Sequence, residues 1–114
     1  MQLPQALVVL VTAVDAEEAD RLARALLDRR LIACANVVPH VRSLFHWENR
    51  LECAEESLLI MKTTADALAP LTAEVKRLHS YDVPEVIALP VVGGSAEYLS
   101  WVAAETHPVP TGDA

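Results

Sequence analysis

The spacing of apolar residues changes several times along the chain, and each change marks the start of a new element. Consecutive β-branched and aliphatic residues predict strands, whereas apolar residues three and four apart predict amphipathic helices. Asp15, Thr64 or Asp66, and Ser95 each stand where an N-cap is expected. The predicted elements are, in chain order, a strand over 6–12, a helix over 16–31, strands over 32–47 and 51–63, a helix from 64 or 66 to about 79, a strand over 85–91 and a short helix from 95 to 105.

This order, βαββαβ followed by a short helix, is the split-βαβ arrangement of ferredoxin-like domains. The sequence therefore predicts an α+β fold, with one antiparallel sheet and both main helices on the same face of it. The chain of 114 residues fits one domain, which we place over residues 1–107. Residues 108–114 have no core-forming pattern, so we expect a mobile tail there.

The two long central strands predict a hairpin with a turn at 48–50 and an irregularity at Pro39. Proline has no N–H to donate, so a bulge or an edge is expected at that position. Strict alternation would otherwise place odd-numbered residues 35–47 on one face and even-numbered residues 34–46 on the other. A turn at Glu48-Asn49 makes the numbers of paired residues sum to about 97 or 98. The resulting pairs are Asn36 with about Lys62, Arg42 with about Glu56, Cys34 near Thr63 and Cys53 near Phe45, so no internal disulfide is expected.

Three of the predicted strands are apolar at consecutive positions. They contain Val8–Val11, Leu58–Met61 and Val86–Leu89. Neighbouring residues of a strand point to opposite faces, so both faces of this sheet need cover. The two main helices can cover only one face, and soluble monomers rarely leave a large apolar patch exposed. The pattern therefore predicts that other copies of the chain cover the second face.

Charge and composition limit the classes of binding partner and the cellular location that the sequence predicts. Sixteen acidic and nine basic residues give a formal charge of −7, which disfavours nucleic acid and anionic membranes and is compatible with cation binding. No apolar run approaches the roughly 20 residues of a membrane span. The first residues carry no basic segment typical of a signal peptide, so a cytoplasmic location is expected. Two cysteines are too few for a disulfide scaffold.

Five short stretches follow one another in a recognisable order. They read LIACAN over 31–36, SLFHWE over 43–48, ESLLIMKT over 56–63, HSYDVPE over 79–85 and YLSW over 98–101. Together they resemble the CutA family of divalent-cation tolerance proteins, from about residue 6 to residue 102. The sequence departs from the family pattern at Phe45, which replaces Tyr, at Asn49, which replaces Gly, and at Ser80, which replaces Pro.

The resemblance implies a trimer related in architecture to the PII signalling proteins, with a role in tolerance of copper and other divalent cations. It also implies ligand clefts between subunits. The cleft residues expected from it are Cys34, Asn36, Trp47, Glu48, Glu56, Lys62, Tyr81 and Glu85. Copper ligands proposed in the family fall at Val11, Leu78 and His79, and of these only His79 can bind a metal.

Three residues keep two interpretations each. His79 either stabilises the negative end of a helix or ligates a metal. Cys34 is either a small buried apolar residue or a reactive one, a metal ligand or a nucleophile. Lys62, inside an apolar strand, either forms an ion pair or binds an anion.

No catalytic motif is present in the sequence, so a non-enzymatic role is expected. A trimeric protein that binds divalent cations is the first hypothesis for its function. A PII-like sensor of a small molecule or anion and a trimeric scaffold for other proteins are the alternatives.

Overall fold

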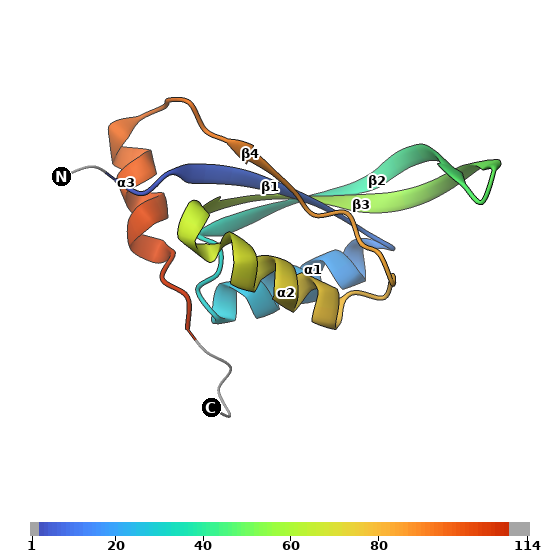
Figure 1. Cartoon of the computed structure of the whole chain (residues 1–114), viewed down its shortest axis with the longest axis horizontal. Coiled ribbons are helices and arrows are strands. Elements are labelled where there is room, and N and C mark those ends of the chain that lie inside the picture. Colours follow the sequence, from blue (N-terminus) through green and yellow to red (C-terminus); the bar gives the residue numbers. More distant parts are fainter. Residues whose placement is uncertain (1–2, 110–114) are drawn as a thin grey trace.

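The computed structural model describes residues 3–109 and has the predicted order of elements. Four antiparallel strands form one sheet in the order β2-β3-β1-β4, which confirms the α+β class (Figure 1). Of the expected tail, residues 110–114 lie outside the described part. The elements are β1 Ala6–Ala13, α1 Ala16–Asp28, β2 Cys34–Trp47, β3 Arg50–Thr64, the 3₁₀ turn η1 Ala65–Ala67, α2 Leu68–Leu78, β4 Ile87–Pro90 and α3 Ala96–Glu105.

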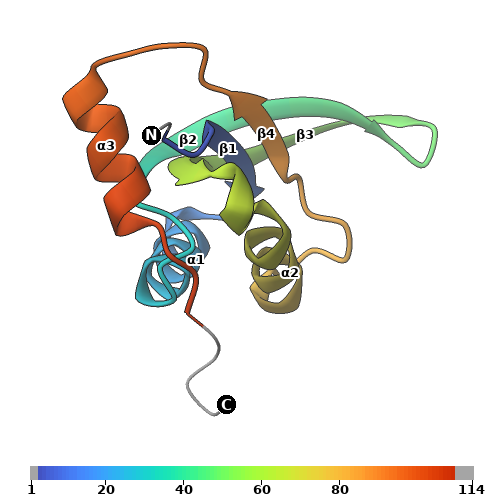
Figure 2. The same cartoon turned by 60° about the vertical axis from the view of Figure 1, so that its left-hand side comes forward.

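Helices α1 and α2 lie side by side on one face of the sheet, as Figure 2 shows, while α3 packs at one end of it. Alternate residues of β1 and β3 point toward these helices and are almost completely buried. The predicted apolar stripes of the two helices pack against these strand residues. The core consists of Leu7, Val9, Val11, Ala13, Leu59 and Met61 from the sheet, Ala19, Leu22, Ala23 and Leu26 from α1, Leu31 and Ile32 after it, and Leu71 and Val75 from α2.

The first helix ends at Asp28, three residues before the predicted end. Arg30 adopts a left-handed conformation, with φ of 56°, and its N–H donates to the carbonyl of Leu27. The N–H of Leu31 donates to the carbonyl of Leu26, so the chain folds back over the last turn. This ending needs no glycine, and it turns Leu31 into the core.

The irregularity predicted at Pro39 is confirmed as a β-bulge. The register of β2 against β3 shifts between Val38 and Val41, and His40 has a φ of 60°. Because of the extra residue, strict alternation along β2 was the wrong expectation. Residues 34, 36 and 38 pair with 62, 60 and 58, while 41, 43, 45 and 47 pair with 56, 54, 52 and 50. Both sets therefore share the face opposite the helices.

Two causes account for the errors in the predicted register, namely the exact position of the turn and the bulge. Glu48 and Asn49 form a two-residue turn with φ values of 51° and 62°, so pairs near the turn sum to 97. Beyond the bulge the pairs sum to 96. The expected partners were therefore wrong by one or two residues. The observed pairs are Cys34 with Lys62, Asn36 with Ile60, Arg42 with Glu55 and Leu44 with Cys53.

Other boundaries differ slightly from the expectation. The second main helix starts with the η1 turn, and neither Thr64 nor Asp66 gives it a side-chain cap, because Thr64 makes no such hydrogen bond and Asp66 lies inside the turn. The last strand covers only Ile87–Pro90. At α3 the predicted cap is confirmed, since the Ser95 hydroxyl accepts from the N–H of Tyr98 at 3.3 Å.

The face of the sheet opposite α1 and α2 is apolar, as the consecutive apolar residues predict. Val8 and Leu10 of β1 pair with Leu89 and Ile87 of β4, and on the other side with residues 62 and 60 of β3. Ile87 and Leu89 are each 47% exposed, whereas the helix-facing residues of β1 are at most 8% exposed. Among residues 3–109, the two main helices leave this face uncovered, as Figure 2 shows.

The turn at Glu48-Asn49 yields a test of the hairpin geometry. Replacing Asn49 with Gly should raise the free energy of unfolding by about 0.5 kcal/mol, because glycine adopts positive φ without strain. Replacing it with Val should lower this free energy, because a β-branched residue is strained there. Denaturant unfolding measures both, and equal stability of the two variants would contradict the type I′ turn.

Candidate ligand-binding site

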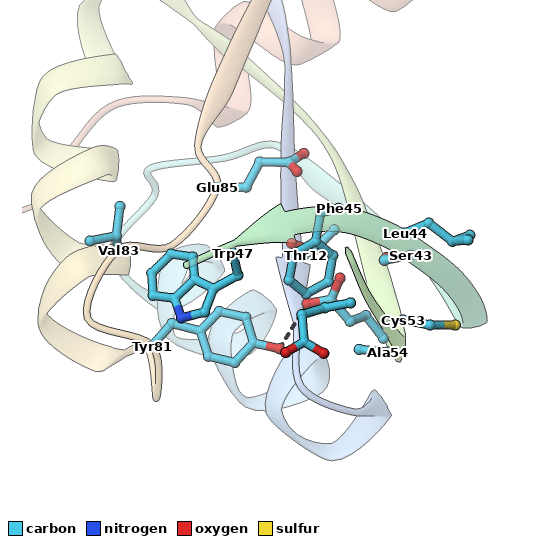
Figure 3. A pocket seen from close by; sticks show the side chains of 12 residues that line it. Thr12, Ser43, Leu44, Phe45, Trp47, Cys53, Ala54, Tyr81, Val83 and Glu85 are labelled. Atoms are coloured by element: carbon cyan, nitrogen blue, oxygen red, sulfur yellow. Dashed lines mark hydrogen bonds between the residues drawn. The ribbon is translucent and has the colours of Figure 1, made fainter. Parts of the chain in front are cut away.

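A hollow of about 710 Å³ lies between the β2–β3 hairpin and the segment that joins α2 to β4 (Figure 3). Its walls come from three parts of the chain that are distant in sequence, namely the end of β1, the hairpin and the α2–β4 segment. The lining residues are Thr12, Ser43, Leu44, Phe45, Trp47, Glu52, Cys53, Ala54, Glu56, Tyr81, Val83 and Glu85. None of these residues is basic.

Three aromatic rings border the hollow. Phe45 and Trp47 come from β2, and Tyr81 faces them from the α2–β4 segment (Figure 3). Trp47 is 56% exposed and Phe45 is 40% exposed, so their rings are not packed into the core. Phe45 and Trp47 point to this side because the bulge at 39–40 shifts the alternation of β2.

Two carboxylates lie close to each other in this hollow. Glu56 of β3 is only 8% exposed, and its Oε2 accepts from the Tyr81 hydroxyl at 2.7 Å. Burial and this bond to Glu56 together raise the pKa of Tyr81 to about 12. Burial, followed by the charge of Glu56, raises the pKa of Glu85. The hollow therefore holds more negative charge than its own residues balance.

His79 lies behind Tyr81 and supports this wall of the hollow. Its ring is fully buried, its Nε2 lies 2.8 Å from the carbonyl oxygen of Thr12, and its Nδ1 accepts from the N–H of Tyr81 at 3.0 Å. His79 is also the C-cap of α2. Both ring nitrogens thus have partners within the chain, and these bonds fix the position of Tyr81. In this arrangement the imidazole has a structural role and has no free lone pair for a metal.

Glu18 supports the same segment from α1. Its Oε1 accepts from the N–H of Val14 at 2.9 Å, and its Oε2 accepts from the N–H of Ser80 at 2.8 Å. Arg21 adds an ion pair at 3.3 Å. Burial alone would raise the pKa of Glu18, but the hydrogen bonds from Val14 and Ser80 outweigh it and hold the pKa below its ordinary value. A satisfied carboxylate therefore ties α1 to the wall of the hollow.

A second cluster lies at the other end of the sheet, near α3. Lys62 donates to the Oδ1 of Asn36, and the Cys34 sulfur lies 3.4 Å from the Tyr98 hydroxyl. The bond with Cys34, together with burial, raises the pKa of Tyr98. The ring of Tyr98 also lies against Trp101, with centroids 5.6 Å apart.

The eight cleft residues expected from the sequence thus fall into three places. Trp47, Glu56, Tyr81 and Glu85 line the hollow. Cys34, Asn36 and Lys62 belong to the cluster near α3, and Glu48 is exposed at the hairpin turn.

The sequence analysis missed several residues of the hollow and its support. Thr12, Phe45 and Glu52 line it, and Glu18 holds its wall in place. The alternation of β3 contained a signal for Glu52, which shares a strand face with Glu56. For Glu18 the sequence showed only a capping pattern.

A preformed metal centre is not found within residues 3–109. No group of three or more His, Cys, Asp or Glu residues there has an arrangement that would hold a metal ion. Cys34 and Cys53 are both free thiols. Among the described helices, none has the length and apolar character needed to cross a membrane.

The Glu18 contacts predict how stability depends on pH. A carboxylate with a depressed folded-state pKa stabilises the fold at a pH above its ordinary value of 4.5, and this stabilisation is lost as the pH falls through the lower, folded-state value. Glu18→Gln should therefore lower the free energy of unfolding at pH 7 by about 1–3 kcal/mol. Urea unfolding from pH 7 to pH 3 measures this difference, which should shrink in acid.

The control for this experiment is the neighbouring, exposed Glu17. Glu17→Gln removes the same charge from the same turn of α1 and should change stability by less than about 0.5 kcal/mol. A Glu18→Gln protein as stable as the Glu17→Gln protein at pH 7 would contradict the structural role of Glu18.

Comparison with known proteins identifies relatives along almost the whole chain. The family model of the CutA1 divalent ion tolerance protein matches residues 7–105. The chloroplastic protein CutA of Arabidopsis thaliana is 45% identical over 101 residues, which are 89% of this chain and 56% of that protein. The chain thus spans little more than half the length of this plant relative.

Two further relatives agree over their full lengths. The divalent-cation tolerance protein CutA of Thermus thermophilus is 43% identical over 99 residues, which are 87% of this chain and 96% of that protein. The crystal structure of CutA1 from Oryza sativa superposes with a TM-score of 0.90 at 43% identity, covering 92% of this chain and 96% of the other. The chain therefore belongs to the CutA1 divalent ion tolerance family.

Proposed function

We propose that the protein is a non-enzymatic homotrimer that binds divalent cations, copper among them, in clefts where subunits meet. The observation that carries this proposal is the pair Glu56 and Glu85, which share a hollow without a basic residue. Carboxylate oxygens are the ligands that hard divalent cations prefer. Burial and, after it, the charge of Glu56 raise the pKa of Glu85, and a bound cation would offset both effects.

The trimer is part of this proposal because the open face of the sheet is apolar. Val8, Leu10, Leu58 and Ile60 need a partner surface of the same character, and a second copy of the chain provides one. A neighbouring subunit would also extend the shallow side of the hollow, where Trp47 is exposed. The free thiols of Cys34 and Cys53 fit a reducing compartment, so we place the protein in the cytoplasm.

Copper ligation by His79 remains a prediction with a structural condition attached. The imidazole would have to give up its bonds to Thr12 or Tyr81 before a nitrogen becomes available. The carboxylates of the hollow need no such rearrangement. We therefore assign the first cation contacts to Glu56 and Glu85 rather than to His79.

Calorimetry of tag-free protein with magnesium, manganese and copper tests the metal site. The intact protein should bind one or more of these ions, and Glu85→Gln should weaken binding about tenfold, since it removes one of two charged ligands. Glu55→Gln is the control. Glu55 directly precedes Glu56 on β3 but points to the opposite face from Glu56, and its side chain is 71% exposed. Absence of binding by all three ions, or equal affinity of the two variants, would contradict the assignment.

Lys62 favours a second candidate, a sensor of a small anion. Its ammonium has a neutral partner, Asn36, and none of the ion pairs found in the described part of the chain includes it. An unbalanced ammonium on the open face is a suitable contact for a carboxylate or phosphate group. The anion would then be held by Lys62 and Asn36 at a subunit boundary.

Replacing Lys62 with Met separates these roles. The variant should remain an oligomer of unchanged size, because an apolar isostere is often no worse than a buried charge. Binding of citrate or phosphate, measured by calorimetry, should be lost if Lys62 holds an anion. Dissociation of Lys62→Met into monomers in a sedimentation experiment would instead make the residue structural.

A further inference from the structure

We propose that the hollow between the β2–β3 hairpin and the α2–β4 segment binds a small organic cation, a quaternary or protonated amine. The proposal goes beyond the binding of metal ions and does not depend on it. Three observations carry it, namely the unbalanced charge of a buried carboxylate, the three aromatic side chains that border the hollow and the size of the hollow.

The buried carboxylate is Glu56. Its exposed fraction is only 8%. Its carboxylate accepts a hydrogen bond from the phenol of Tyr81. None of the ion pairs found within residues 3–109 includes Glu56. Glu52 and Glu85 line the same hollow and add negative charge. A buried carboxylate without a cationic partner is unfavourable, so the charge pattern selects a cation as ligand.

The aromatic walls offer an organic cation contacts that a bare metal ion does not use. Trp47, Phe45 and Tyr81 surround the hollow in Figure 3. Aromatic faces attract alkylated ammonium groups, and tryptophan does so most strongly. The remaining apolar surface, from Leu44, Val83 and Ala54, suits methyl or methylene groups rather than water. A hard metal ion would gain nothing from these walls.

The size of the hollow agrees with this ligand class. Its volume of about 710 Å³ falls in the range of roughly 300–1,000 Å³ that is usual for small-molecule sites. A single metal ion would occupy a small part of it. Two hydrogen bonds fix Tyr81, one from its hydroxyl to Glu56 and one from its backbone N–H to His79. Its hydroxyl therefore supplies a rigid polar part of the wall.

The test is calorimetry of the intact, tag-free protein with choline and with its neutral isostere 3,3-dimethylbutan-1-ol. Choline should bind, and the isostere should bind at least about tenfold more weakly, since it has the same shape without the charge. Glu56→Gln should weaken choline about tenfold or more, whereas Glu55→Gln, on the opposite face of the same strand, should leave it unchanged. Trp47→Leu is the second variant if Glu56→Gln fails to fold, and it should weaken choline by a similar factor.

Each outcome decides the matter. Equal binding of choline and the isostere, or equal affinity of the Glu56→Gln and Glu55→Gln proteins, would overturn the proposal. Absence of choline binding would also overturn it. A parallel titration with magnesium and copper separates the two proposals, because metal binding without choline binding overturns only this one.

Discussion

The structure depends on one constraint, which is that its sheet has two apolar faces and its main helices cover one of them. On the covered face, Val9, Val11, Leu59 and Met61 are completely buried against α1 and α2. On the other face, most of their immediate neighbours in the strands are also apolar, namely Val8, Leu10, Leu58 and Ile60, and α1 and α2 do not cover them. The hydrophobic effect scales with the apolar area removed from water, so the chain gains its full stability only when this second face is covered.

The bulge at Pro39-His40 connects this constraint to the candidate site. It shifts the alternation of β2 by one residue, so that Phe45 and Trp47 lie on the same side of the sheet as the uncovered apolar face. The aromatic side chains of the hairpin therefore lie beside the surface where another copy would dock. The candidate hollow and the uncovered apolar face thus lie on one side of the molecule.

The buried carboxylates of Glu18 and Glu56 differ in how well the chain satisfies their charge. Glu18 accepts hydrogen bonds from two backbone N–H groups and an ion pair from Arg21, and its pKa is lowered. Glu56 has a phenol as partner, and burial together with the charge of Glu56 raises the pKa values of its neighbours Tyr81 and Glu85. A carboxylate that the chain satisfies holds the fold together, whereas a carboxylate that it leaves unbalanced is available for a ligand.

Much of the fold could be predicted from the sequence, because local signals agreed with one another. The caps Asp15 and Ser95, the helical stripes and the bulge at Pro39 were read correctly from residue types and spacing. The end of α1 was missed because Arg30 takes a left-handed conformation that usually marks glycine.

The candidate site was predicted only in part, for geometric reasons. Each residue of error in the register moves a side chain to the other face, and the size of a bulge cannot be read from a proline. The resemblance placed Lys62 with Tyr81 and Glu85 in a cleft between subunits, and within one chain Lys62 lies beside Asn36, away from the hollow. The family resemblance gave four of the residues that line the hollow, and their role as ligand contacts stays a prediction.

The most direct test of the account is the dependence of mass and thermal stability on protomer concentration. If other copies cover the apolar face, sedimentation equilibrium should give three times the chain mass of 12.4 kDa. The unfolding temperature should then rise with protein concentration, because dissociation and unfolding are coupled. A monomer of 12.4 kDa at micromolar concentration, with an unfolding temperature unchanged over a hundredfold dilution, would contradict the central claim.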